Sequence, residues 1–178
     1  MFGSFKTNYF CSKGILMRKK LINESETNMS KPESDYLDIE QLAQVEISSE
    51  CSDYPIEFAL LAGSNVGWKA ADAGNQVIRL IFDEPQTIKH IELLFDEPEV
   101  ARTQEFVLLW RMDKASIFRE ILRQQFHFSP PLTTRQSENY AVDLNQLRVL
   151  ELRIIPDMSG VQSFAQLTKL RLYTVNKN

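Results

Sequence analysis

The sequence predicts an all-β fold: an eight-stranded antiparallel jelly-roll-like β-sandwich preceded by a disordered N-terminal extension. From Leu42 onward, short runs alternate between apolar and polar residues, and Gly, Pro, Asn and Asp separate these runs. Helical stretches are expected only near residues 56–61 and 162–167, and both are too short to change the fold class. Period-two alternation over so many segments is hard to obtain from helices, so the β-sandwich is favoured.

Residues 1–40 differ in composition from the rest of the chain. Their first half is basic, their second half is acidic, and no apolar period persists through them. This pattern is typical of a flexible, disordered extension, which places the sandwich domain at residues 41–175. The alternative is a weak membrane or partner anchor built from four aromatic residues near the start: Phe2, Phe5, Tyr9 and Phe10.

Eight strands are expected, each from its own apolar alternation. Their bounds are 42–48, 75–82, 87–95, 103–112, 118–128, 139–144, 149–155 and 165–173. The fourth is apolar on both faces, which is typical of a strand at the centre of a sheet. The seventh has the most regular pattern, because Leu150, Leu152 and Ile154 alternate with Glu151 and Arg153.

Other strands present a polar face that we expect to point toward solvent. The fifth carries a polar row with the members Arg119, Arg123, Gln125 and His127. The eighth alternates Leu170 and Leu172 with Lys169 and Arg171. If these two polar faces share a sheet, they form a basic strip that could bind a glycan; a solvated sheet face is the simpler interpretation.

Short and long connections alternate strictly between the predicted strands. The short links are 83–86, 113–117 and 145–148, and the long ones are 49–74, 96–102, 129–138 and 156–164. If successive strands run antiparallel, all the long loops lie at one end of the sandwich. Loops held on a rigid scaffold commonly carry binding residues, so this end is the predicted location of a site.

The bulk composition excludes several function classes. The formal net charge of -4 gives no overall attraction for nucleic acid. No run approaches the ~20 apolar residues of a membrane span, and the N-terminus lacks the apolar core of a secretory signal. Cys11 and Cys51 fit no disulfide framework or metal-ligand spacing, so we expect free thiols in a cytoplasmic protein.

No catalytic constellation is present, and the chain is therefore predicted not to be an enzyme. Nucleophile-elbow, phosphate-binding-loop, dinucleotide-binding and zinc-protease motifs are all missing from the sequence. His90 and His127 are the two histidines, and neither has an acidic or cysteine partner at metal-ligand or general-base spacing. An enzyme using residues scattered along the sequence is the remaining alternative.

Several segments in order resemble the discoidin domains, also called coagulation-factor type C (F5/8 type C) domains, of the galactose-binding-like superfamily. These segments are Ser48-Ser49, the loop with Pro55, Ala59 and Gly63, Gly67-Trp68, and the runs 76–82, 106–110, 150–156 and 170–172. The resemblance implies a sandwich that binds sugars, phospholipid head groups or proteins at its loop end. Sugar-binding relatives often hold calcium, yet the last strand here offers Lys169 and Arg171 instead of an acid, so no metal or cofactor is expected.

Four residues are the candidate ligand contacts: Tyr54, Trp68, Arg102 and Arg135. Trp68 could be a platform for a sugar ring, although the resemblance and its position after Gly67 also fit a core plug. Tyr54 is the better candidate for an exposed aromatic contact. Arg102 and Arg135 lie in two long loops and could donate paired hydrogen bonds to hydroxyls, a carboxylate or a phosphate. The alternative is that each is a solvated charge in its loop.

Two functions from different classes follow. The first is a non-catalytic binding module for a carbohydrate or another polyhydroxylated ligand at the long-loop end. The second is a protein-interaction or homo-oligomerisation domain that uses a sheet face. An exposed apolar patch would favour the second function.

Overall fold

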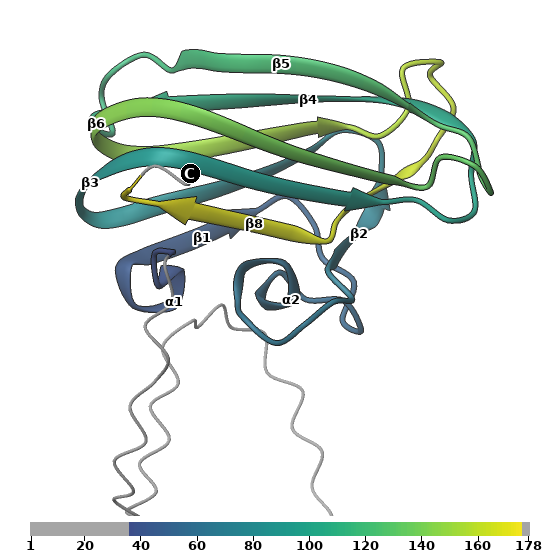
Figure 1. The fold of residues 1–178 in the computed structure, drawn as a ribbon, viewed down its shortest axis with the longest axis horizontal. Coiled ribbons are helices and arrows are strands. Elements are labelled where there is room, and N and C mark those ends of the chain that lie inside the picture. Colours follow the sequence, from purple (N-terminus) through teal and green to yellow (C-terminus); the bar gives the residue numbers. More distant parts are fainter. Residues whose placement is uncertain (1–35, 176–178) are drawn as a thin grey trace, which may run out of the picture.

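Two long strands run through both layers of the sandwich. In the computed structural model, which describes residues 36–175, β3 (Gln76–Asp96) and β6 (Arg135–Ile155) pair antiparallel almost from end to end. The register shifts between Ile81 and His90, where both strands turn. Figure 1 shows this turn at one end of the sandwich, so the two halves of each strand lie in opposite layers.

The first layer is a five-stranded sheet with the order β1-β3-β6-β4-β5. It contains β1 (Ala43–Ile47), the first half of β3, the second half of β6, β4 (Arg102–Arg111) and β5 (Arg119–Phe128). The second layer is a three-stranded sheet in which the second half of β3 lies between β8 (Lys169–Tyr173) and the first half of β6. All these pairings are antiparallel, which confirms the predicted all-β sandwich.

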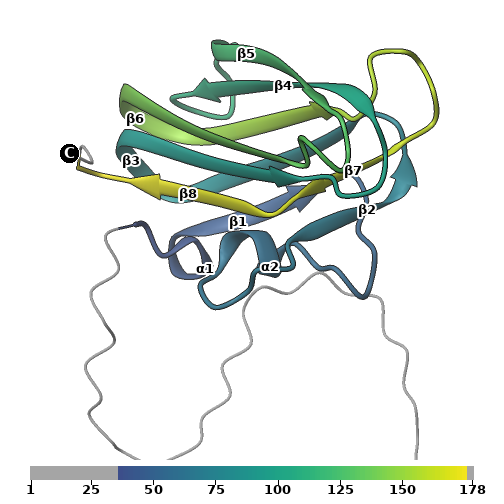
Figure 2. The same cartoon turned by 45° about the vertical axis from the view of Figure 1, so that its right-hand side comes forward.

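Three smaller elements complete the described part of the chain. The strands β2 (Trp68–Ala73) and β7 (Phe164–Leu167) pair in a ladder of their own. The helices α1 (Ile39–Leu42) and α2 (Glu57–Leu60) are single turns that lie beside β1 and β8, as Figure 2 shows. The short helix expected near residues 56–61 is therefore present, and the one expected near 162–167 is strand instead.

The core fills the space between the two sheets with the apolar faces that the alternation predicted. From the two long strands it takes Ile78, Leu80, Phe82, Ile91, Leu93, Phe95, Leu150, Leu152 and Ile154. Phe106 and Leu108 of β4 join them, and each of these side chains is almost completely buried. Burying one side chain of this size stabilises a fold by about 1.5–3 kcal/mol before the entropy cost, so this layer is the main source of stability.

The strand bounds differ from the expected ones at several places, and β2 and the start of β6 lie where long loops were expected. Residues 83–86 and 145–148 were predicted as turns between strands, but they are bends inside β3 and β6. Gln146 takes a left-handed conformation with φ 60° at the second bend. The predicted last strand is divided into two at Thr168, because β7 pairs with β2 whereas β8 pairs with β3. The N–H of Thr168 donates to the carbonyl of Leu94 at this point.

The ordered domain begins before its predicted boundary. The N–H of Leu37 donates to the carbonyl of Leu172 at 2.7 Å, and Ile39 of α1 is buried in the core. Residues 36–40, predicted to belong to the extension, thus pack on the sandwich. The rest of that extension, including Cys11 and the four aromatic anchor candidates, lies outside the described residues.

The long loops meet at one end of the sandwich, as the connection lengths predicted. Figure 1 shows them at the end opposite the bends of β3 and β6. Hydrogen bonds join different loops there: the N–H of Glu97 to the carbonyl of Thr134, and the N–H of Gly74 to the carbonyl of Ser163. The loops therefore form a connected surface.

Gly67 should be essential for the approach of the first long loop to β7. It has φ 79°, and a Cβ added there would lie 2.5 Å from the carbonyl oxygen of Leu167 and from Cα of Thr168. Gly63 has φ 89° with open space around it, so Gly63→Ala is the matched control. We expect Gly63→Ala to lower the free energy of unfolding by about 1–2 kcal/mol, and Gly67→Ala by a further ~1–3 kcal/mol because of the clash.

Urea unfolding of the two variants measures this difference. Equal losses would show that the contact between the loop and β7 is not needed for stability.

Candidate functional site

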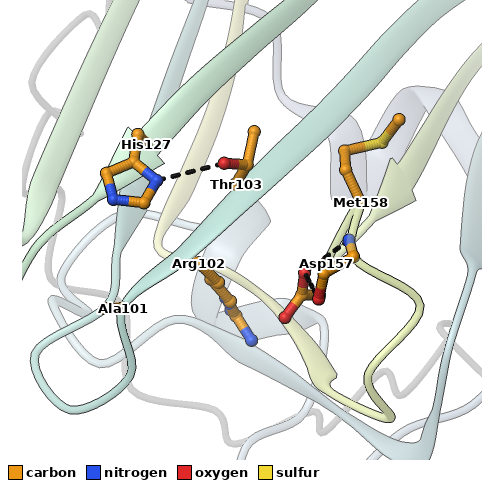
Figure 3. A pocket seen from close by; sticks show the side chains of 7 residues that line it. Ala101, Arg102, Thr103, His127, Asp157 and Met158 are labelled. Atoms are coloured by element: carbon orange, nitrogen blue, oxygen red, sulfur yellow. Dashed lines mark hydrogen bonds between the residues drawn. The ribbon is translucent and has the colours of Figure 1, made fainter.

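An open depression of about 410 Å³ lies at the loop end, and we call it the loop-end depression. The start of β4, the end of β5 and the loop after β6 supply its lining residues: Ala101, Arg102, Thr103, His127, Asp157, Met158 and Ser159. Figure 3 shows the side chains of His127 and Thr103 on one side and those of Asp157 and Met158 on the other. Segments far apart in sequence thus face one hollow.

The β4–β5 ladder positions the imidazole of His127. The register places Thr103 directly opposite His127, and the Oγ1 of Thr103 lies 3.0 Å from Nδ1 of the ring (Figure 3). This hydrogen bond holds the ring orientation, whichever of the two groups donates. Among the described residues, Nε2 of His127 has no protein partner, so it can donate to or accept from a ligand.

Asp157 is held by the turn that follows β6. Its Oδ1 accepts hydrogen bonds from the N–H of Ser159 at 2.8 Å and from the Oγ of Ser159 at 2.6 Å. These hydrogen bonds hold the pKa of Asp157 below its usual range, with a smaller contribution from the charge of Arg102. The N–H of Met158 donates to the carbonyl of Thr103, so the turn is fastened to β4.

Arg102 and Glu97 form a buried ion pair beneath the depression. Arg102 is 5% exposed and Glu97 is 6% exposed, and Nη2 of the arginine lies 2.8 Å from Oε2 of the glutamate. The two side chains attract each other as an ion pair. Burial lowers the pKa of Arg102, and the charge of Glu97 partly opposes this effect.

The same two side chains connect three segments of the loop end. Nη1 of Arg102 donates to the carbonyl of Phe164 at 3.0 Å, and Nε2 of Gln166 donates to Glu97 at 3.0 Å. The backbone N–H groups of Glu99 and Val100 also donate to the Glu97 carboxylate. Arg102 therefore holds the loops in place, and little of its guanidinium faces the depression.

The depression offers hydrogen-bonding groups beside one apolar side chain. His127, Thr103, Ser159 and the carboxylate of Asp157 supply donors and acceptors, while Met158 is 44% exposed.

In residues 36–175, no group of three His, Cys, Asp or Glu side chains is placed to hold a metal ion. The same part of the chain contains no helix of the length and apolarity needed to cross a membrane.

The four predicted ligand residues do not converge on this depression. Trp68 is completely buried in the core, so its prediction as a ligand contact is wrong. Arg102 does line the depression, but it is engaged by Glu97 and Phe164. Tyr54 is half-buried with Nζ of Lys69 4.5 Å from its ring centre, and Arg135 is exposed at the start of β6. Neither Tyr54 nor Arg135 lines the depression.

Sequence reasoning missed Thr103, Asp157, Met158 and Ser159 as members of a site. It placed His127 in a polar row on the fifth strand, without connecting it to the loops. A signal was present in the segment after β6, where Pro, Asp, Ser and Gly occur within five positions, a composition typical of a side-chain-stabilised turn. The pairing of Thr103 with His127 required the strand register, which the sequence alone does not specify.

Comparison with known proteins identifies the fold. The chain matches the CBM32 of AlyQ, solved with 4,5-unsaturated mannuronic acid, with a TM-score of 0.55 and 15% identity over 75% of this chain and 96% of that one. It matches an F5/8 type C domain from Bacteroides fragilis with a TM-score of 0.54 and 14% identity over 80% and 97% of the two chains. The chain thus shares the fold of these CBM32 and F5/8 type C domains.

A larger protein also contains this fold. A Ruminococcus gnavus GH29 fucosidase in complex with fucose matches with a TM-score of 0.57 and 9% identity over 76% of this chain. The present chain spans about a quarter of that protein, 26% of its length. No protein-family model matches the sequence, and no curated protein matches it.

Removing Glu97 should destabilise the loop end strongly. Glu97→Ala would leave the Arg102 guanidinium buried without its counter-charge, which typically costs about 3–5 kcal/mol. Glu99→Ala is the matched control, because Glu99 is exposed and two residues away, and we expect it to change stability by less than ~0.5 kcal/mol. Chemical unfolding monitored by tryptophan fluorescence measures both. A loss for Glu97→Ala no larger than that of the control would show that the pair does not organise the loops.

Proposed function

We propose that this chain is a non-catalytic binding module for a carbohydrate or another polyhydroxylated ligand, held in the loop-end depression. The observation that carries the proposal is the convergence there of an oriented imidazole, two hydroxyls and an ionised carboxylate. Sugar hydroxyls both donate and accept, so a site for them needs groups of both kinds at fixed positions. His127 and Asp157 are each held by a neighbouring hydroxyl group, Thr103 and Ser159 respectively.

The apolar part of the depression supports the same ligand class. The thioether side chain of Met158 is exposed beside the polar groups and offers contact to the C–H face of a sugar ring. Small-molecule sites generally combine such apolar contact with a few polar groups that set orientation. The fold adds support, because proteins that share it include the CBM32 of AlyQ, whose structure contains an unsaturated mannuronic acid.

A second candidate function is the binding of a protein partner at the loop end. Most of the large apolar side chains that are exposed in residues 36–175 belong to the long loops or to the strand that directly follows one: Val66, Val100, Leu132, Met158, Val161 and Phe164. Exposed apolar side chains that gather on one surface mark interaction sites. Light scattering of the protein alone tests self-association, and a dimer that buries the depression would exclude the carbohydrate site.

The carbohydrate proposal predicts that two substitutions weaken sugar binding while two others do not. We expect His127→Ala and Asp157→Ala each to reduce affinity at least ~10-fold, equivalent to about 1.4 kcal/mol, because each removes an oriented polar group. Tyr54→Ala and Arg135→Ala are the controls, since both were plausible ligand contacts from sequence and both lie outside the depression.

Affinity electrophoresis in gels containing galactan, mannan, alginate or polygalacturonate measures these effects. Loss of retardation in Tyr54→Ala or Arg135→Ala, with His127→Ala and Asp157→Ala unchanged, would place the site elsewhere. If the wild-type protein is not retarded in any gel and is dimeric, the protein-partner function replaces this proposal.

A further inference from the structure

Arg171 of β8 is buried against the first long loop, although its strand face was expected to point toward solvent. The residue is 6% exposed. Its Nη1 donates to the carbonyl of Ala59 at 2.6 Å and to that of Leu170 at 2.7 Å. Its Nη2 donates to the carbonyl of Leu61 at 2.6 Å. Backbone oxygens from two distant segments therefore surround one guanidinium group.

No carboxylate pairs with this buried charge. None of the ion pairs found within residues 36–175 involves Arg171. Glu92 lies directly opposite Arg171 in the β3–β8 ladder. Its carboxylate accepts instead from Nζ of Lys169 and from the hydroxyl of Tyr173, the latter at 2.8 Å. The guanidinium is thus a buried cation whose direct polar contacts are backbone carbonyls.

Two of these carbonyls belong to the end of α2, the single turn that Figure 2 shows beside β8. The last carbonyls of a helix have no donor within the helix, so they need one from elsewhere. The turn cannot shift into water to find a donor, because Ala59 and Leu60 are 0% and 1% exposed and pack in the core. Arg171 supplies the donors and so fastens the first long loop to the last strand.

An aromatic ring covers the same guanidinium. Cζ of Arg171 lies 5.1 Å from the centre of the Tyr36 ring, which is a cation–π distance. Burying a charge is costly unless polar groups replace the water that it loses. Here carbonyl oxygens and the face of a ring replace that water. These are the surroundings of a cation site, which the chain fills with its own side chain.

The resemblance to discoidin domains raises the question of calcium at this position, between the first long loop and the last strand. Calcium binds 6–8 oxygens, commonly backbone carbonyls together with carboxylates. The carbonyls of Ala59, Leu61 and Leu170 are suitable oxygens, but each already accepts from the guanidinium. A divalent ion at the same oxygens would be repelled by that charge, and β8 contains no acidic residue. The residues present therefore do not fit calcium.

We propose that the guanidinium of Arg171 takes the place of a bound metal ion, so that the first long loop is organised without one. A side chain cannot dissociate, whereas a bound calcium ion leaves when its concentration falls. The fold and its loop end are accordingly insensitive to calcium and to chelators. The inference does not rest on the carbohydrate function, because none of the measurements that test it uses a sugar.

Thermal unfolding of the full chain in EGTA and in about 10 mM CaCl2, well above the Kd of weak calcium sites, is the first test. We expect the two midpoints of the wild-type protein to agree within ~1 °C, because an ion that does not bind the native state does not stabilise it. A midpoint at least ~3 °C higher in CaCl2 would overturn the inference, since the native protein would then bind calcium.

Removing the guanidinium tests whether it holds the loop. Arg171→Met keeps an unbranched apolar side chain but leaves buried carbonyls without donors. We expect it to lower the unfolding midpoint by ~8 °C or more, and to speed amide hydrogen exchange in residues 51–67 more than in β4 and β5. Lys169→Met is the matched control, because Lys169 lies on the same strand face and donates to Glu92 rather than to a carbonyl. It should lower the midpoint by no more than ~3 °C.

Reversing the charge should turn the position into a metal site. Arg171→Glu places a carboxylate among the carbonyl oxygens that the guanidinium now contacts, a set suited to calcium. We expect this variant to unfold far below the wild-type protein in EGTA and to regain at least ~5 °C in CaCl2. MgCl2 should not replace CaCl2, because magnesium demands near-ideal octahedral geometry. Arg171→Gln has the same size without the carboxylate and should show no calcium response.

The outcomes separate the proposal from an ordinary buried arginine. A calcium response in Arg171→Glu, with none in the wild-type protein or in Arg171→Gln, supports it. A folded Arg171→Glu without any calcium response would show that the carbonyls do not form a cation site and would overturn it. Equal losses in Arg171→Met and Lys169→Met would overturn it as well. If Arg171→Glu does not fold in either buffer, the wild-type comparison and Arg171→Met still decide.

Discussion

The antiparallel ladder between β3 and β6 is the interaction on which the rest of the structure depends. β3 bends near Gln86 and β6 bends near Leu147, and each strand contributes one half to each sheet. The two layers are therefore covalently continuous. Because the bends occupy one end of the sandwich, the long connections between the sheets are left at the other (Figure 1). The same ladder positions β6, and β6 in turn supports β4. The position of the loop-end depression is a consequence of that pairing.

The loop end is organised by buried charge as well as by apolar packing. Glu97 and Arg102 connect the turn after β3, the start of β4 and the region of β7, which gives the depression a fixed floor. The groups that face the hollow are oriented by single neighbouring hydroxyls, Thr103 for His127 and Ser159 for Asp157. Such preorganisation lowers the entropy cost of binding, which a small polar ligand could otherwise not offset.

The sequence predicted the sandwich, its core faces and the gathering of the long loops, because each depends on local alternation and connection length. It did not predict the continuity of β3 and β6, since bends near Pro85 and Gln146 have the composition of turns. It identified Arg102 at the loop end but assigned it to a ligand, because the burial that Glu97 compensates is a tertiary property. His127 and Asp157 line the same depression because of the strand register and because the loop after β6 folds back onto β4. Neither feature can be inferred from a local sequence pattern.

The most direct test of the carbohydrate site is a map of backbone amide shifts during titration with a sugar oligomer. Two-dimensional NMR of isotope-labelled protein, titrated with an oligomer of a polysaccharide that retards the protein in affinity gels, locates the contact without any substitution. The account predicts the largest shifts at Thr103, His127, Met158 and Ser159, which line the loop-end depression. Shifts concentrated around Tyr54 and β2, with the depression unchanged, would contradict it.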